Sequence, residues 1–300
     1  MKKNIVVTGI EGFLGNYLAK TYDSEKYVLQ GTYFNKDRIL PKFLLPAIFL
    51  DITDKKEVFK VLDKMHPDII IHTAGNSNTD VSENNPTQCY KATVGGTKNI
   101  ADWCKLNYKQ LVYCSTNAIF SGDDAPYNET SIPYPINRYG MHKYLAENIA
   151  STVNTHLIFR LILMYGWNYS TRMNPVTFVI KALREGKKIN MVENSSYVNP
   201  LNIISCCDGI WKGIELNKDR EIYHLAGKNK CDRYDLALKV AEVFDLDKSL
   251  ISPVPDNFYS SLAKRPYDSS YITTKAEVEL GFKPLTLEEG LSLMKKEENI

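Results

Sequence analysis

Three glycines at three-residue intervals, Gly9, Gly12 and Gly15, constrain the fold of this chain more than any other feature. They follow a short apolar run that is typical of a first β-strand, and they open a segment that is typical of a helix. In that order, the first glycine permits a tight turn and the second lets the backbone approach a pyrophosphate. The third allows close packing of the helix on the strand. The position of the pattern favours a dinucleotide-binding turn over an ordinary glycine loop.

Strand-like and helix-like segments alternate through the first half of the chain. Strands are expected at residues 4–8, 27–33, 47–50, 68–73, 110–115 and 156–160, and helices at 12–22, 55–65, 86–107 and 139–153. Strands that are apolar on both faces and separated by helices indicate a parallel sheet covered on both sides. We therefore predict an α/β protein with a doubly wound parallel sheet of the Rossmann type.

The rhythm of the pattern changes in the second half, which predicts a smaller, interleaved substrate lobe. Residues 1–165 are expected to form the dinucleotide-binding domain, rejoined by about 200–225, and residues 166–300 mainly the substrate-binding lobe. The 37 basic and 35 acidic side chains give a net charge of +2, which predicts neither a nucleic-acid partner nor a membrane surface. Six scattered cysteines without a CxxC pair are expected to be reduced, as in a cytoplasmic protein.

The second strand ends without the acid that commonly holds the ribose 2′-hydroxyl of NAD, since Thr32 or Tyr33 fills that place. Asn35, Lys36 and Arg38 follow and suit a 2′-phosphate, which favours NADPH, with NADH as the alternative. In the alternative interpretation Lys36 and Arg38 are solvated loop charges, and Asp37 binds the ribose instead. Two interpretations of Asp51 are open: it contacts the adenine, or it only forms a turn. The other expected cofactor contacts are Phe13, Leu14, Ile52, Thr73, Ala74 and Gly75.

Tyr139 and Lys143 are four residues apart, so they project from one face of the helix expected there. In that geometry the ammonium favours the phenolate and lowers the pKa of the tyrosine. A more acidic tyrosine is a good proton donor or acceptor near neutral pH. Ser115 or Thr116 ends a buried strand at the sheet edge where open α/β folds bind ligands. Beside a dinucleotide, this set indicates carbonyl–alcohol redox chemistry.

Several segments together resemble the extended short-chain dehydrogenase/reductase superfamily, and within it the dTDP-4-dehydrorhamnose reductase family. They are the glycine loop, LDITD at 50–54, STNAIFSG at 115–122, PYNET at 126–130, YGMHK at 139–143 and RPYDSSYITTKAEVELG at 265–281. The resemblance implies a reductase of a nucleotide-linked 4-keto-6-deoxy sugar. It gives Thr116 the family's hydroxyl position, Tyr139 the role of catalytic acid and Lys143 the role of cofactor-ribose ligand.

Substrate contacts are expected from residues around the same cleft, namely Asn76, Thr116, Trp167, Asn174 and Arg265. For Arg265 a surface salt bridge is an equal alternative, and for Trp167 a place in the core. No metal site is expected, because His66 and His72 form no ligand cluster with Cys or carboxylates. A homodimer is the expected assembly if the chain associates at all.

One departure from the family pattern helps to rank the alternative functions. Asn117 stands where the family usually has an acid, which argues against a 4,6-dehydratase. A 4-epimerase would prefer an acid at the end of the second strand. The resemblance extends to the β subunit of methionine adenosyltransferase, so a non-catalytic NADP-binding regulatory subunit is the alternative from another functional class.

Overall fold

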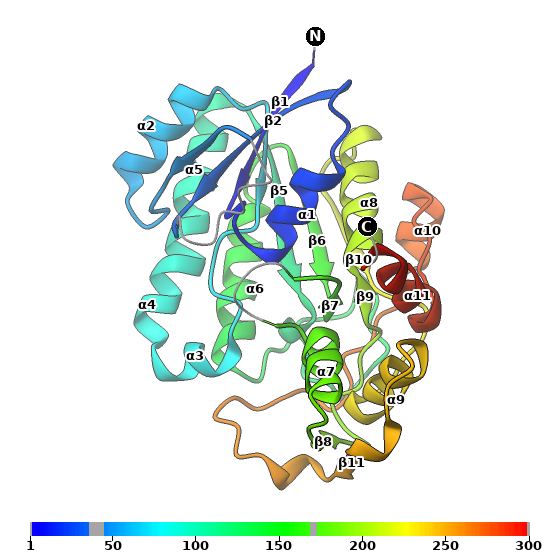
Figure 1. Ribbon diagram of the computed structural model, residues 1–300. Helices are drawn as coiled ribbons and strands as arrows, with labels where there is room; N and C mark the ends of the chain where they lie inside the picture. The colour runs from blue at the N-terminus through cyan, green and yellow to red at the C-terminus, as the bar shows by residue number, and fades with distance from the viewer. Residues whose placement is uncertain (1, 36–44, 169–172, 299–300) are drawn as a thin grey trace.

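The computed structural model describes residues 2–35, 45–168 and 173–298. Within these residues the main element is a seven-stranded parallel sheet with the order β10-β6-β5-β4-β1-β2-β3 (Figure 1). The strand order reverses at β1, which pairs with β2 on one side and β4 on the other. This confirms the predicted doubly wound α/β fold. The strands are β1 (Lys3–Thr8), β2 (Tyr27–Tyr33), β3 (Ala47–Phe49), β4 (Ile69–His72), β5 (Gln110–Thr116), β6 (His156–Leu161) and β10 (Glu221–Leu225).

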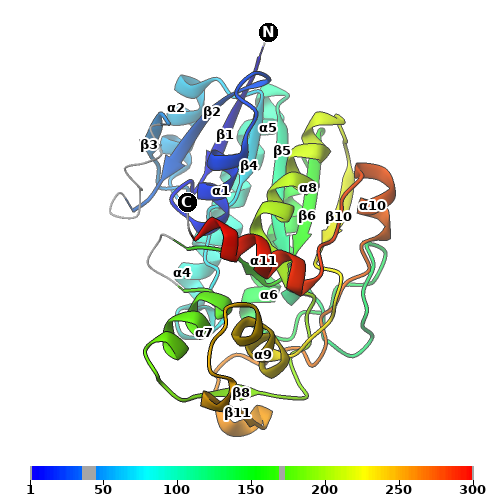
Figure 2. The same cartoon turned by 45° about the vertical axis from the view of Figure 1, so that its right-hand side comes forward.

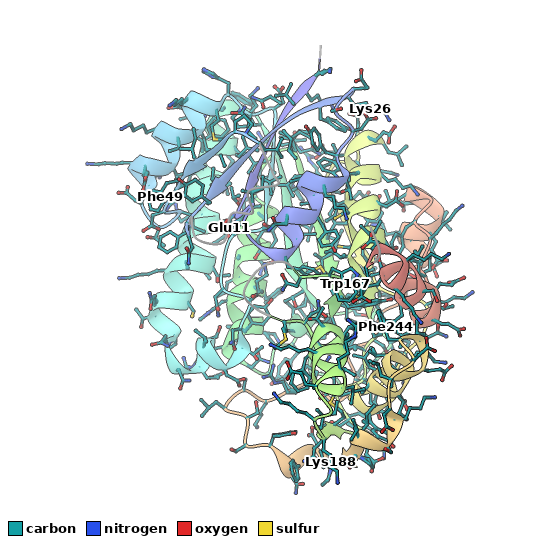
Figure 3. The ribbon with its side chains drawn as sticks, viewed as in Figure 1. Glu11, Lys26, Phe49, Trp167, Lys188 and Phe244 are labelled. Atoms are coloured by element: carbon teal, nitrogen blue, oxygen red, sulfur yellow. The ribbon has the colours of Figure 1, made fainter. Side chains whose placement is uncertain are left out.

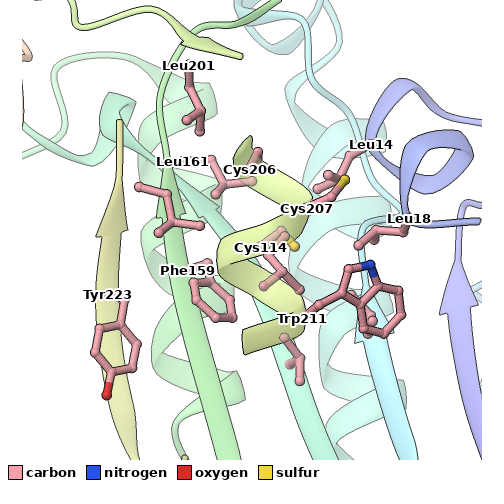
Figure 4. Packing of buried hydrophobic residues seen from close by; sticks show 14 of the residues in the cluster. Leu14, Leu18, Cys114, Phe159, Leu161, Leu201, Cys206, Cys207, Trp211 and Tyr223 are labelled. Carbon is pink, nitrogen blue, oxygen red and sulfur yellow. The ribbon is translucent and has the colours of Figure 1, made fainter. Parts of the chain in front are cut away.

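Helices cover both faces of the sheet, as Figures 1 and 2 show. On one face Leu14 and Leu18 of the first helix pack near Trp211, and this core continues to Cys114 and Phe159 (Figure 4). A second buried core fills the other face. Burying a large apolar side chain stabilises the fold by about 1.5–3 kcal/mol, so both cores hold the sheet in place. The helices are α1 (Phe13–Thr21) and α8 (Ile203–Glu215) on the first face, and α2 (Lys55–Met65), α5 (Gly96–Asn107) and α6 (Arg138–Ala150) on the second.

The segment predicted as one helix over 86–107 is interrupted. It consists of α4 (Pro86–Tyr90), a π-helical stretch (Lys91–Gly95) and α5. A π-helical stretch widens the turn and shifts the residues that face inward. Here it packs against α6, the helix that carries Tyr139 and Lys143. A short helix that was not predicted, α3 (Thr79–Asn84), precedes it.

A second lobe lies beyond the carboxyl ends of the strands (Figures 1 and 2). Its own core joins Val179, Leu236 and Leu291 from three helices. Its elements are α7 (Pro175–Arg184), α9 (Arg233–Val243), α11 (Leu287–Glu297) and the parallel pair β8 (Ile189–Val192) and β11 (Ile251–Val254). The pair β7 (Met164–Tyr165) and β9 (Leu201–Asn202) connects it to the sheet, and α10 (Thr274–Leu280) lies against β10. None of the helices described is both long and apolar enough to cross a membrane.

Candidate active site

The glycine loop is folded tightly against the end of β4. Gly9 has φ +71°, and a Cβ there would lie 2.9 Å from the Cα of Ala74. A Cβ on Gly15 would lie 2.5 Å from the carbonyl oxygen of Gly9, so neither position accepts a side chain without a shift of the backbone. Gly12 donates its N–H to the Gly9 carbonyl (3.0 Å) and begins α1 without a capping side chain. The N-terminus of α1, where Phe13 and Leu14 lie, is therefore open to an anion such as a pyrophosphate.

The end of β4 closes the other side of this loop. The Thr73 hydroxyl donates to the carbonyl of Thr8 (2.7 Å), and the Ala74 N–H donates to the Thr8 hydroxyl (3.3 Å). Gly75 follows with φ +145°, a backbone conformation that favours glycine. These three predicted cofactor residues therefore lie beside the glycine loop.

Two other predicted cofactor residues are engaged in local structure. An Asp51 carboxylate oxygen accepts hydrogen bonds from the backbone N–H and the hydroxyl of Thr53 (2.9 and 2.8 Å), which matches the turn-forming interpretation. The Ile52 side chain is buried, and Gly96 leaves room for it at the start of α5. The Ile52 carbonyl also accepts a hydrogen bond from Asn99 Nδ2 (2.9 Å).

An acid lies at the end of β2 after all, but it comes from the glycine loop. Glu11 Oε1 accepts hydrogen bonds from the backbone N–H groups of Phe34 (2.9 Å) and Asn35 (3.3 Å). Its Oε2 is buried and has no hydrogen-bond partner in the described part of the chain. Lys36 and Arg38, predicted to hold a 2′-phosphate, lie outside the described residues. The sequence prediction gave Glu11 no role, because the sequence does not show that the glycine loop reaches the end of β2.

Helix α6 begins at the carboxyl edge of β5 because Asn137 caps it. The Asn137 Oδ1 accepts the N–H of Gly140 (2.8 Å), and its Nδ2 donates to the carbonyl of Lys264 (2.9 Å). A Cβ on Gly140 would overlap the carbonyl oxygen of Ala118, so the first turn of α6 lies directly on the short helix after β5. This contact brings Tyr139, the partly buried residue before Gly140, to the same edge as the end of β5.

Thr116 is the last residue of β5 and is buried. Its hydroxyl accepts the Ala118 N–H (3.3 Å) and donates to Asn117 Oδ1 (3.3 Å). The Asn117 amide in turn donates to the Ser269 hydroxyl (2.6 Å), so the residue that replaces the family's acid ties the site to the C-terminal segment. The structure thus fixes Thr116 by neutral hydrogen bonds.

Lys143 points from α6 back toward β5. Its Nζ donates to the carbonyl of Cys114 (2.5 Å) and lies 4.2 Å from the centroid of the Tyr113 ring. Burial lowers the pKa of Lys143 to about 8, because the charged form loses hydration there. Sequence reasoning missed the role of Tyr113, since nothing local in the sequence shows which ring lies under an ammonium 30 residues later.

The predicted substrate residues divide into two sets. The Asn76 amide donates to the Ser82 hydroxyl (2.7 Å), and Arg265 pairs with Asp80 (2.8 Å), so both residues lie against α3. Arg265 is therefore in the salt-bridge arrangement that was its alternative interpretation.

Trp167 and Asn174 have structural partners in the second lobe. The Trp167 ring packs edge-on against Phe244 (6.0 Å between centroids), and its Nε1 donates to the carbonyl of Met294 (2.6 Å) (Figure 3). Asn174 caps α7 and donates to the carbonyl of Gly166 (2.8 Å). Both therefore help to hold α7 and α11 beside the site.

Comparison with known proteins assigns the family. A family model described as the RmlD substrate binding domain matches residues 2–300. The chain belongs to the RmlD family. The fold of the RmlD family is also seen in the crystal structure of dTDP-4-dehydrorhamnose reductase from Bacillus anthracis in complex with NADP. That structure aligns with a TM-score of 0.88 and 28% identity and covers 99% of this chain and 100% of the other.

Two curated relatives show that similarity within this group extends beyond one activity. The probable low-salt glycan biosynthesis reductase Agl14 of Haloferax volcanii is 26% identical over 292 residues, 96% of each chain. Methionine adenosyltransferase 2 subunit beta of Rattus norvegicus is 24% identical over 280 residues, 92% of this chain and 82% of that protein. Sugar-nucleotide reductases are close structural relatives of this chain, which supports an oxidoreductase.

Proposed function

We propose that this protein is an NADPH-dependent reductase of a nucleotide-linked 4-keto-6-deoxy sugar. The observation that carries the proposal is the packing of α6, which bears Tyr139 and Lys143, against β5, which ends in Thr116. The similarity to the NADP-bound Bacillus anthracis reductase over nearly the whole chain supports both the cofactor and the substrate class.

The cofactor would be held by the N-terminus of α1 and by the small residues that end β4, against which a Cβ on Gly9 would collide. Bound NADPH would supply the hydride that reduces the keto carbon. The protein's own contribution is to move a proton and stabilise charge on the carbonyl oxygen as it becomes an alkoxide. Residues 166–300 would mainly cover the sugar and exclude water. The protein would act in the cytoplasm.

Tyr139 donates the proton to the developing alkoxide in this proposal. The Thr116 hydroxyl, which now donates to Asn117 Oδ1, would donate to the substrate oxygen instead. One such donor stabilises a developing oxyanion by about 2.7–4 kcal/mol. Lys143 keeps a positive charge against the same strand end and favours the phenolate of Tyr139 after proton transfer.

A second candidate is a non-catalytic regulatory subunit. It is favoured by the similarity to methionine adenosyltransferase 2 subunit beta, which spans 92% of this chain. Such a protein would bind the dinucleotide and a protein partner without turning over a sugar. A pseudoenzyme can keep the same fold and side chains, so turnover of a sugar is the property that distinguishes the two candidates.

The test is incubation of the protein with NADPH and a panel of nucleotide-linked 4-keto-6-deoxy sugars, followed by the absorbance of the reduced cofactor. Oxidation of NADPH with one member, and none with the corresponding 4-hydroxy sugar, supports the reductase. Tight NADPH binding without turnover of any member, together with formation of a complex with a methionine adenosyltransferase catalytic subunit, would replace it by the regulatory function.

A further inference from the structure

We infer that Glu11 narrows the preference for NADPH over NADH, by binding the adenosine ribose hydroxyls and competing with a 2′-phosphate, so that NADH also binds while NADPH stays the preferred cofactor. The inference rests on the proposed function, because it requires a nicotinamide dinucleotide at the glycine loop. It adds an acid to a site where the end of β2 has none: Thr32 and Tyr33 occupy that place. The acid reaches the site from the loop between β1 and α1.

The first observation is what Glu11 already holds. Its Oε1 accepts the N–H groups of Phe34 and Asn35, the two backbone donors directly after β2. Backbone N–H groups are common ligands of phosphate oxygens in proteins. A 2′-phosphate at this end of β2 would therefore compete with a carboxylate for the same donors, and the two anions would repel each other.

The second observation is the unused oxygen of the same carboxylate. Glu11 Oε2 is buried and has no hydrogen-bond partner among the residues described. A buried acceptor without a donor is costly, and a hydroxyl is the group that relieves this cost without adding charge. Dinucleotide folds place the adenosine ribose at this strand end, where a carboxylate accepts from the 2′-hydroxyl. Glu11 is therefore suited to an unphosphorylated ribose.

The third observation is an open cavity at the same strand end. It measures about 470 Å³ and is lined by Tyr33, Phe34, Asn35 and Phe49. The Phe34 and Phe49 rings stack with 5.9 Å between centroids and are 63% and 45% exposed. Figure 3 labels Phe49 and Glu11 on neighbouring parts of this edge. Exposed aromatic faces offer a surface for an adenine ring. The cavity shares Phe34 and Asn35 with the Glu11 contacts, so the adenosine half of the cofactor would lie there, next to Glu11.

The experiment measures the dissociation constants of NADH and NADPH by calorimetry for the wild type, Glu11→Gln and Glu11→Ala. The Gln variant keeps an acceptor for the Phe34 and Asn35 N–H groups and removes only the charge. Glu25→Gln is the matched control, since Glu25 is exposed in the turn before β2. AMP and 2′-AMP are measured in parallel, because they confine the comparison to the adenosine end.

Glu11→Gln should change the ratio of the NADH to the NADPH dissociation constant by about tenfold in favour of NADPH. A change of about tenfold corresponds to the free energy of one hydrogen bond to a charged group. Glu11→Ala should shift it at least as far, the AMP pair should move in parallel, and Glu25→Gln should leave the ratio unchanged. Ratios that stay within twofold of the wild type in both Glu11 variants would make Glu11 a structural cap only and overturn the inference. If both dinucleotides bind the wild type, that failure leaves the proposed function standing; if neither binds, the proposed function fails and the inference fails with it.

Discussion

Helix α6 carries Tyr139 and Lys143, and a buried ion pair fixes it to the sheet. Glu147 lies one turn after Lys143, and Arg160 on β6 reaches it through Nη2–Oε1 (2.7 Å) and Nε–Oε1 (3.1 Å). Both side chains are 4% exposed. Among the described residues, Glu147→Ala would leave the buried guanidinium with the Glu129 carbonyl and the His224 imidazole as hydrogen-bond partners, beside the Phe120 ring. Removing one partner of such a pair costs about 3–5 kcal/mol.

That loss is a large part of a typical unfolding free energy of about 5–15 kcal/mol. We therefore expect Glu147→Ala to lower the free energy of unfolding by about 3–5 kcal/mol, measured by urea denaturation with circular dichroism. The double variant Glu147→Leu with Arg160→Met replaces both charges by apolar groups and should recover most of the loss. A single-variant cost below about 1 kcal/mol, or a double variant as unstable as the single one, would refute the reasoning.

Three further outcomes are expected. Gly15→Ala should weaken NADPH binding, measured by calorimetry, by at least about tenfold, because the added Cβ would lie 2.5 Å from the Gly9 carbonyl oxygen. Gly95→Ala is the control and should leave NADPH binding unchanged, because a Cβ there has no atom within 4 Å. The pKa of Lys143 is lowered to about 8, so its ammonium is present below that pH and lost above it. We therefore expect kcat/KM for NADPH to fall as the pH rises through about 8, and Lys143→Arg to shift this fall to higher pH. Thr116→Val keeps the shape but removes the donor, so kcat for the keto sugar should fall by about 10²–10³ with unchanged NADPH affinity; an unchanged kcat would contradict its role.

The doubly wound sheet could be predicted because its determinants are local. A tight turn is predicted by the glycines at 9, 12 and 15, and a covered parallel sheet by strands that are apolar on both faces. In each case the signal lies in neighbouring residues. The π-helical stretch at Lys91–Gly95 has no local sequence pattern that predicts it, because it packs against α6, a distant segment of the chain. Strands β7 and β9 have two residues each, too few for a period to be read.

The site was less open to prediction, because its contacts join distant segments. Glu11 was overlooked because the acid was sought at the end of β2, and only the fold shows that the glycine loop reaches that place. The hydrogen bond from Asn117 to Ser269 spans 152 residues, and that from Asn137 to Lys264 spans 127. The roles proposed for Tyr139 and Thr116 are supported by the packing of the helix that carries Tyr139 against the strand that ends in Thr116.

The most direct test of the account compares Tyr139→Phe with the wild type on the sugar that the wild type reduces. The variant loses one hydroxyl and no carbon, so the NADPH dissociation constant should stay within about twofold. Turnover measured from the absorbance of the reduced cofactor should fall by about 10²–10⁴, the usual contribution of a general acid. Reduction of the keto sugar by Tyr139→Phe at the wild-type rate would contradict the account, because another group would then supply the proton.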